Sequence, residues 1–253
     1  MRQRDGAILT MVCGALAVEV ALTEQFLKFV RPGMRPYIVA SGLALIVIAV
    51  PVLIATRWGG GARGEGGDSS GSARHAHAGS RVGWLLLAPL LVAVIIAPGT
   101  FGSWAAARQR GVTFAIHRDF DFGAYLRTQQ VAGVKPSLKL IDFLEVASQR
   151  NQRELLAKVD IEIKGFVSHE VDDPPGTFRI NRFAIGCCAG DASLMQVEVR
   201  GARTEPSVDA WISATIRFSG TLTPVGESYV TPVVRLVEMK NIKTPSNPFE
   251  YLY

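Results

Sequence analysis

Three long apolar runs dominate the hydrophobic pattern of the first 100 residues, at residues 7–30, 38–56 and 82–100. The second run contains no charged residue. As a helix it would span about 28 Å, close to the thickness of a bilayer core. The third run is equally long and contains Pro89 and Pro98, which transmembrane helices tolerate. The pattern therefore predicts a membrane domain of three transmembrane helices at residues 1–100.

The first run is the least apolar of the three because it carries Glu19 and Glu24. Its basic start, at residues 1–4, resembles that of a cleaved signal peptide. Two further apolar runs follow directly, however, and Glu19 interrupts the stretch, so we expect a retained helix. Within a bilayer Glu19 would face protein or water. It either contacts a partner or an ion in an assembly, or it lies near the membrane surface.

Basic residues near the ends of the three runs set the expected orientation. Six lie on the side of the N-terminus and three on the opposite side: Arg2, Arg4, Arg57, Arg63, Arg74 and Arg81 against Lys28, Arg31 and Arg35. Because basic residues favour the cytoplasm, we expect a multi-pass protein of the plasma membrane with a cytoplasmic N-terminus. Three crossings then place residues 101–253 outside the cytoplasm.

The loop at residues 57–81 contains eight glycines among Ser, Ala and Arg. Such a composition cannot bury a core, which predicts a flexible segment. His75 and His77 lie two positions apart within it. Two histidines could contact a metal ion, but a tight site needs more ligands, so a solvated linker is the simpler interpretation.

The hydrophobic period changes in the second part of the chain, at residues 101–253. Residues 102–111 form a short polar connector. Four apolar residues then recur at helical spacing: Leu140, Phe143, Leu144 and Ala147. This spacing predicts an amphipathic helix that ends near Asn151, so one or two helices are expected before the strands begin.

From residue 160 onward, apolar and polar residues alternate as they do in strands. Five segments show this pattern: residues 160–167, 178–188, 194–199, 210–218 and 229–239. The alternation slips by one position at Asn181 and Arg182, which predicts a β-bulge, and Pro232 suggests an edge or a bulge in the last segment. Five short strands predict an OB-like β-barrel at residues 160–253, with a sandwich as the alternative.

The predicted fold class is therefore an α+β membrane protein, with three N-terminal transmembrane helices followed by a small OB-like barrel domain. The aromatic, proline-broken tail at residues 244–253 is expected to pack on the barrel in an extended form. Such an organisation fits a mean hydropathy of +0.22 and a content of charged residues of only 19%.

The distribution of charge decides how the net charge of +5 is interpreted. Residues 1–100 carry nine Lys and Arg against five Asp and Glu, whereas residues 101–253 carry eighteen against seventeen. The basic excess thus flanks the apolar runs. Because the polar half is close to neutral, it offers no phosphate-binding face, and we expect no nucleic-acid partner.

Candidate chemistry concentrates at residues 182–192, where Cys187 and Cys188 precede a Gly-Asp turn. If the strand alternation continues to residue 188, Cys187 points into the core and Cys188 points outward. Cys188 and Asp191 could then bind a soft metal ion such as zinc or copper(I). Further candidate ligands are Cys187, His169 and Glu170.

Other interpretations of the two cysteines stay open. A vicinal disulfide is possible in an oxidising compartment but forces poor geometry on the linking peptide. Redox reactivity would need a lowered thiol pKa, for which Arg182 is the only nearby cation in the sequence. Structurally, both cysteines could simply be small residues that fill a tight corner.

The sequence contains no catalytic signature. P-loop and CxxC motifs are absent, and His117 has no evident partners. The segment at residues 172–176 (DDPPG) is most simply a turn. We therefore expect a protein that is not an enzyme.

Short motifs in the second half carry a family resemblance: Gly165-Phe166-Val167, Arg182-Phe183, Cys187-Cys188 with Asp191-Ala192, and Trp211. Together with the three apolar runs and the His-x-His loop, they resemble the DUF1980 family of bacterial membrane proteins, the YcgQ-like group of permease-subunit proteins. The resemblance implies association with a multi-spanning permease similar to exporters of arsenicals or heavy metals. Many relatives have a dense histidine run where only His75 and His77 stand here.

Two functions follow as hypotheses. The first is a non-enzymatic accessory subunit of a permease, in metal-ion transport or homeostasis. The alternative is an extracytoplasmic metal- or redox-sensing membrane protein that uses the Cys187-Cys188 stretch, with zinc or another soft metal ion as its ligand. Tight metal binding by residues 112–253 that is lost in Cys188→Ser would favour the alternative.

Overall fold

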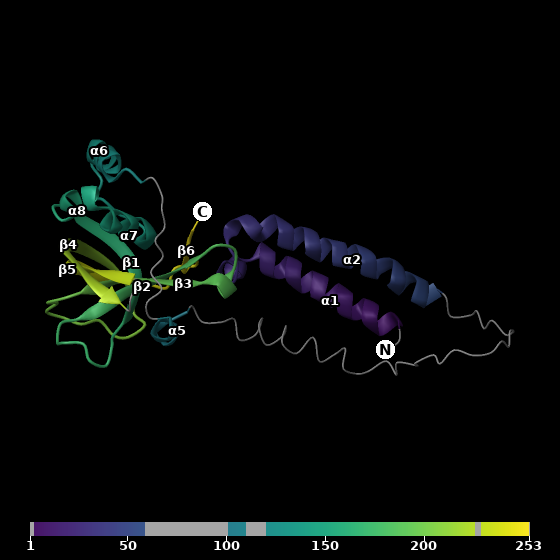
Figure 1. Ribbon diagram of the computed structural model, residues 1–253. Coiled ribbons are helices and arrows are strands. Elements are labelled where there is room, and N and C mark those ends of the chain that lie inside the picture. Colours follow the sequence, from purple (N-terminus) through teal and green to yellow (C-terminus); the bar gives the residue numbers. More distant parts are fainter. Residues whose placement is uncertain (1–2, 59–100, 110–119, 226–228, 253) are drawn as a thin grey trace. The chain divides into compact units, whose positions relative to one another are not determined.

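The residues that the computed structural model describes are 3–58, 101–109, 120–225 and 229–252. They belong to two compact units, Met1–Phe26 with Pro32–Pro98, and Leu27–Arg31 with Gly99–Tyr253. The first unit contains apolar helices, and the second combines a six-stranded sheet with short helices (Figure 1). The predicted α+β class is therefore confirmed.

The first unit contains two long apolar helices, α1 (Gln3–Leu22) and α2 (Arg35–Trp58), which pack against each other (Figure 1). Their backbones come close together at Gly14 and Gly42. A Cβ atom on Gly14 would lie 2.7 Å from the carbonyl oxygen of Gly42, and one on Gly42 would lie 2.8 Å from that of Gly14. Glycine is thus needed at both positions, since small residues let helices pack this closely in membranes.

Both helices are long and apolar enough to cross a membrane, at Arg4–Leu22 and Pro32–Trp58. The first predicted run was too long, because α1 ends at Leu22. Two 3₁₀ turns, η1 (Glu24–Lys28) and η2 (Pro32–Met34), follow it. Glu24 therefore lies outside the helix, whereas Glu19 is an exposed residue of its last turn. The third predicted helix at residues 82–100 and the two loop histidines lie outside the described residues.

The second unit is organised around six strands: β1 (Asp160–Ser168), β2 (Phe178–Ile185), β3 (Ser193–Val199), β4 (Trp211–Val225), β5 (Tyr229–Asn241) and β6 (Phe249–Tyr251). The first five correspond to the five predicted strands, and β6 arises within the predicted extended tail. The strand order is β1-β4-β5-β3-β2-β6, and β1 also pairs with β2. Strand β1 therefore has β4 and β2 as its neighbours.

Gly165 allows β1 to pair with β4 and β2 at once. It lies opposite Ile212 of β4, and the next residue, Phe166, lies opposite Asn181 of β2. A Cβ atom on Gly165 would lie 2.5 Å from the backbone oxygen of Asn181. Any other residue would force the two strands apart, which explains the glycine before Phe166.

Strand β2 is buried on both faces. The β-bulge predicted at Asn181 and Arg182 was wrong. Its register with β3 runs without a break from Phe178 to Ala184. Phe178, Ile180 and Ala184 join the larger hydrophobic cluster, and Phe183 and Ile185 join a second cluster. The slip at Asn181 and Arg182 therefore marks a change in the face that carries the large residues. The strand keeps its regular pairing there.

Register shifts occur instead between β4 and β5. One lies between Thr215 and Ile216, and the other lies between Phe218 and Leu222. Gly220, at a φ of 83°, occupies the second irregularity. Pro232 pairs with Leu222 beside it, but the extra residues of this irregularity belong to β4, so the bulge that Pro232 suggested lies on the partner strand.

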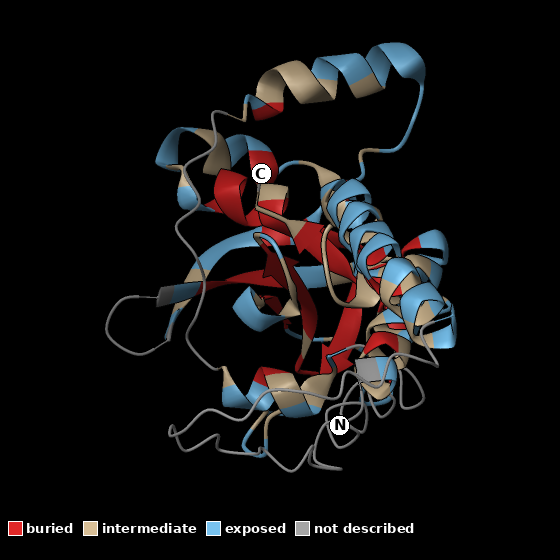
Figure 2. Cartoon of the chain, turned by 90° about the vertical axis from the view of Figure 1, so that its right-hand side faces the viewer, coloured by how far each residue is buried: buried red, intermediate tan, exposed pale blue. Residues whose placement is uncertain are grey.

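Short helices accompany the sheet, among them α6 (Phe122–Ala132), α7 (Leu140–Ser148) and α8 (Arg150–Leu156). Helix α7 packs against β1, β2 and β3, and most of its residues are buried, as the red helix in Figure 2 shows. The predicted amphipathic helix corresponds to α7 and ends at Ser148, since the backbone of Gln149 is extended. Helix α6 was not predicted, and α5 (Ser103–Arg108) forms within the segment predicted as a connector.

The last strand, β6, fixes the C-terminal tail to α7. It pairs with β2 in parallel and buries Glu250. The two carboxylate oxygens of Glu250 accept hydrogen bonds from the backbone N–H groups of Leu140 (2.9 Å) and Ile141 (2.8 Å). Arg182 Nε lies 3.8 Å from Glu250 Oε1. The tail thus satisfies N–H groups at the start of α7 that have no partner within the helix.

Candidate metal site at the double cysteine

The two adjacent cysteines lie in a turn between β2 and β3. Strand β2 ends at Ile185, so Gly186, Cys187 and Cys188 have left the sheet before the short 3₁₀ turn η3 (Ala189–Asp191) begins. The Asp191 carboxylate holds the turn closed. It accepts hydrogen bonds from the backbone N–H groups of Gly186 (3.0 Å) and Cys187 (2.8 Å). We call Gly186–Asp191 the thiol turn.

The orientation expected for Cys187 was wrong. It is exposed, and Cys188 is half-buried. The alternation of β2 stops at Ile185, and the turn that follows no longer obeys the two-residue period. The interpretation of both cysteines as space-filling residues therefore does not apply to Cys187.

The three predicted ligands Cys187, Cys188 and Asp191 do lie together. Their ligand atoms are all within 4.8 Å of one another, and both cysteines are free thiols. A hydrogen bond to the Asp191 carboxylate, with a second to Cys188, raises the pKa of Cys187 to about 11. The thiol of Cys187 is therefore protonated at neutral pH, because each of these contributions raises its pKa. This electrostatic setting does not support a redox nucleophile.

The hydrogen bond between Asp191 and Cys187 shifts the pKa of Asp191 as well. Partial burial acts to raise the pKa of Asp191, but hydrogen bonds from Cys187 and from the backbone of Gly186 and Cys188 outweigh it. The pKa of the carboxyl is therefore below its usual value. Asp191 remains an anion, which is the form that binds a metal ion.

The other proposed ligands lie elsewhere. His169 Nε2 is 3.0 Å from the carbonyl oxygen of Pro206, and its Nδ1 is 3.7 Å from Glu205. Glu170 forms an ion pair with Arg179, 3.3 Å from Nε. Both belong to the loop after β1, whose turn at residues 172–176 is confirmed by a hydrogen bond from Thr177 N to Pro174 O. His117 lies outside the described residues.

The segment that binds the thiol turn was not predicted from the sequence. Residues Leu27–Arg31, which we call the strap, follow α1 in the chain but belong to the second unit. Val30 forms an antiparallel bridge with Cys188. Arg31 N donates to Cys187 O (3.2 Å), and Ala189 N donates to Phe29 O (2.6 Å). The strap thus extends the thiol turn like a short extra strand.

Arg31 adds a side-chain contact to the same turn. Its Nη1 donates to the carbonyl oxygen of Gly186 at 3.4 Å. Backbone and side chain of one strap residue therefore reach two consecutive residues of the turn. The only sequence signal for this contact is a basic residue in the connection between two apolar runs, and that signal was used for orientation alone.

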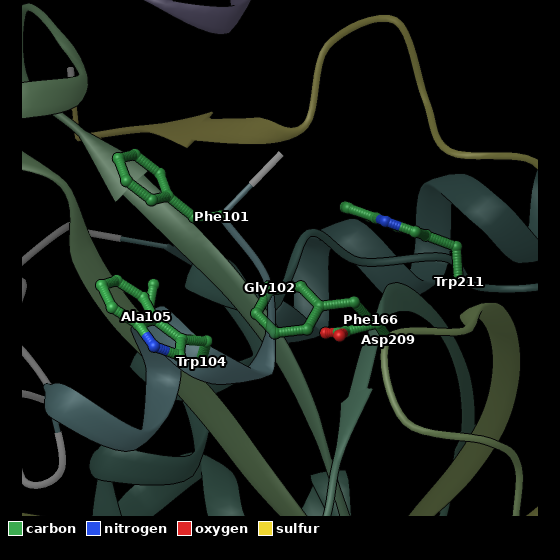
Figure 3. Close-up of a pocket in the computed structure, with 7 residues that line it drawn as sticks. All are labelled: Phe101, Gly102, Trp104, Ala105, Phe166, Asp209 and Trp211. Atoms are coloured by element: carbon green, nitrogen blue, oxygen red, sulfur yellow. The ribbon is translucent and has the colours of Figure 1, made fainter. Parts of the chain in front are cut away.

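Apart from the thiol turn, the domain has a concave region that is lined by aromatic residues. It has a volume of about 460 Å³ and is formed by Phe101, Gly102, Trp104, Ala105, Phe166, Asp209 and Trp211. Figure 3 shows Phe101 and Trp104 on one side, Trp211 on the other, and Phe166 and Asp209 between them. Asp209 Oδ1 accepts a hydrogen bond from Ser103 N (2.6 Å) at the start of α5. The carboxylate thus has a structural role in capping this helix.

The fold and the thiol turn define a class: an α+β protein in which two candidate membrane spans accompany a six-stranded sheet domain with a double-cysteine turn. Residues 139–253 match the model of the DUF1980 C-terminal domain. The chain therefore carries a DUF1980 C-terminal domain, which supports the family that the motifs predicted, and the thiol turn lies within the matched residues.

Two further comparisons add little. A search of the solved structures found "Yeast RPA bound to ssDNA", with 8% identity and a TM-score of 0.27, over 45% of this chain and 79% of that chain. A search of the curated proteins found no match.

Proposed function

We propose that the protein is a non-enzymatic accessory subunit of a multi-spanning permease, anchored in the plasma membrane with its DUF1980 domain outside the cytoplasm. The observation that carries the topology is the pairing between the strap and the thiol turn. The strap directly precedes the second candidate span, Pro32–Trp58. The strap and the domain it binds must therefore share one side of the membrane.

This pairing restricts the number of crossings. Helix α2 has 24 residues and is about 36 Å long, which exceeds a bilayer core of about 30 Å. If α2 spans the bilayer, Trp58 lies on the side opposite the strap. The chain must then cross back before Phe101 to reach the domain. Residues 82–100, although outside the described part of the chain, are the apolar run in the sequence that suits this third crossing.

The distribution of basic residues indicates which side of the membrane the strap and the domain occupy. The ends of the apolar runs that share the strap's side carry Lys28, Arg31 and Arg35, against six arginines on the other side. The more basic side is the cytoplasmic one. We therefore propose that the strap and the domain lie outside the cytoplasm and that the N-terminus lies inside.

The side chains of α2 support a role in an assembly. Several large apolar residues of this helix are exposed: Leu43, Val47, Ile48 and Ile54. In water such a surface would be unstable, so lipid or a membrane partner covers it. A permease whose helices pack on α2 is the partner that the family resemblance suggests.

We further propose that β1 to β5 form an OB-like barrel. The pairings from β1 through β4, β5, β3 and β2 back to β1 support closure, because each of the five strands then has two neighbours. In this arrangement β6 lies outside the ring, on β2.

The topology is tested by labelling with a membrane-impermeant thiol reagent in intact cells. In a Cys13→Ser chain, we expect Cys187 or Cys188 to be labelled without permeabilisation. A control chain with Cys13, Cys187 and Cys188 replaced by Ser and with Ser72→Cys should react only after permeabilisation. Denaturation of both chains afterwards checks that every thiol can react. Labelling of Ser72→Cys in intact cells, with no labelling of Cys187 or Cys188 until permeabilisation, would contradict the proposed sides.

The partner is tested by photo-crosslinking from α2. A photoreactive residue at Val47, which is 68% exposed, should capture a multi-spanning permease in native membranes. The matched control is Ala49, which is 2% exposed and should give no intermolecular product. Capture of lipid alone from Val47, with no permease in the purified complex, would overturn the subunit role.

A further inference from the structure

We propose that the thiol turn binds one soft metal ion through Cys187, Cys188 and Asp191, with zinc as the reference ion, and that binding there is coupled to the strap. This inference goes beyond the proposed function, because the subunit role requires no metal. It rests on the grouping of three ligand atoms and on the hydrogen bonds that join the same turn to residues 29–31.

The geometry of the turn is close to that of a binding site. Zinc–sulfur bonds are about 2.3 Å, so two thiolates on one tetrahedral zinc lie roughly 3.8 Å apart. The three ligand atoms lie within 4.8 Å of one another before any metal binds. Side-chain rotations that move the ligand atoms by at most about 1 Å therefore suffice. No backbone movement is needed, because Asp191 already holds the turn closed.

The ligand chemistry favours a soft ion. Two thiolates and one carboxylate suit zinc or copper(I), whereas magnesium and calcium prefer sites made of oxygen alone. Each Asp191 oxygen accepts one backbone hydrogen bond and retains capacity for a metal. Those backbone bonds fix the orientation of the carboxylate, which is how supporting contacts strengthen metal sites.

Three protein ligands leave a fourth position for water or for a ligand from another molecule. Structural zinc sites are closed by four protein ligands, whereas sites with three keep an open position. Cys187 is exposed, so an ion held here is accessible to solvent. A site of this kind suits reversible binding or transfer of the ion.

The strap is the element that would respond to the ion. It contacts every residue from Gly186 to Ala189, including both cysteines. Joining the two sulfurs through one ion restricts the backbone of Cys187 and Cys188. The same backbone accepts the Arg31 hydrogen bond and pairs with Val30. Metal binding therefore stabilises the pairing between the strap and the thiol turn.

The test uses the full-length protein in detergent, reduced with a phosphine and titrated with Zn²⁺ against a chromophoric chelator. We expect one zinc per chain in the wild type and in Cys13→Ser, which is the matched control for loss of a thiol. Cys187→Ser and Cys188→Ser should weaken binding by at least the roughly 10- to 100-fold that loss of a supporting contact costs at metal sites. Thermal unfolding of the metal-free variants checks that they fold.

Coupling is measured by hydrogen exchange at the backbone amides of Arg31 and Ala189. Zinc should slow both in the wild type and in Cys13→Ser, and should leave both unchanged in the Cys187→Ser, Cys188→Ser double variant. Stoichiometric binding retained by the folded double variant, or absent from the wild type, overturns the site. Binding without a change at either amide overturns the coupling. These readouts need no permease, so their failure is distinguishable from failure of the subunit role.

Discussion

Asp191 serves two purposes at once in the thiol turn. Its carboxylate accepts the backbone N–H groups that close the turn, and it lies beside the Cys187 thiol. The first contact is structural, and the second keeps Cys187 protonated without metal. A cation that binds between the sulfurs and the carboxylate would reverse this preference, because it favours the thiolate.

Replacement of Asp191 by Asn should lower the pKa of Cys187 from about 11 toward its usual value of 9.0. The amide keeps one oxygen to accept a backbone hydrogen bond but removes the negative charge beside the thiol. The measurement is the pH dependence of the alkylation rate of Cys187, followed by mass spectrometry in a Cys13→Ser chain. A profile that keeps its midpoint in Asp191→Asn would show that the carboxylate does not control this thiol.

Glu250 and Arg182 form a buried pair whose charges are both disfavoured. Burial raises the pKa of Glu250, although Arg182 and the N–H groups of Ile141 and Leu140 act in the opposite direction. Burial likewise lowers the pKa of Arg182 despite the attraction of Glu250. Loss of hydration therefore outweighs the attraction between the two side chains, as is common for buried ion pairs.

The raised pKa of Glu250 predicts how stability depends on pH. As pH falls from neutral, the folded protein takes up this proton before the unfolded chain does. The contribution of Glu250 to stability is therefore fully present below the usual pKa of 4.5 and is lost as pH rises through the raised value. Relative to Glu250→Gln, the wild type should gain stability on acidification. Denaturant unfolding of both chains at a series of pH values measures this, and a wild type that loses stability relative to Glu250→Gln on acidification would contradict it.

At the scale of elements, the two glycines determine how α1 and α2 pack. Gly14→Leu should destabilise the helix pair by about 1–3 kcal/mol, since the added side chain meets the Gly42 backbone, Ile46 and Leu45. Gly6→Leu is the control on the same helix, where a Cβ meets nothing within 4 Å. Thermal unfolding of the helices in detergent compares the two. Equal stability of both variants would mean that the helices do not pack in this way.

Much of the element pattern could be predicted from local residues. The five strands from β1 to β5 follow from alternation, because one or both of their faces are buried in a regular way. The second helix, α8, and the break at Gln149 were not predicted, because residues 149–154 are polar and carry no apolar periodicity. Strand β6 also depends on tertiary contacts, through Glu250 and Phe249.

The candidate site was predictable only in part. Adjacent cysteines next to a Gly-Asp turn identified the three residues that lie together. The end of β2 at Ile185 reversed the expected orientation of Cys187. The strap was not predictable, because its partners lie more than 150 residues away in the chain, and Phe29 and Val30 resemble the end of an apolar run.

At the scale of the whole molecule, the strap links membrane topology to the DUF1980 domain. A connection between two spans can pair with the thiol turn only if both are on one side of the bilayer. The same pairing places the candidate metal ligands against the residues that lead into α2. The proposed topology and the proposed coupling of the metal site both depend on this contact.

Disulfide trapping in native membranes tests that contact directly. Val30 and Cys188 are bridge partners, and such partners have Cα atoms about 4.5–5.5 Å apart, within the range that a disulfide joins. In a Cys13→Ser, Cys187→Ser chain with a protease site inserted within residues 59–81, Val30→Cys should form a disulfide with Cys188. The two fragments then stay joined until reduction, whereas Lys28→Cys gives much less product. Fragments that separate without reduction in the oxidised Val30→Cys chain would contradict the account.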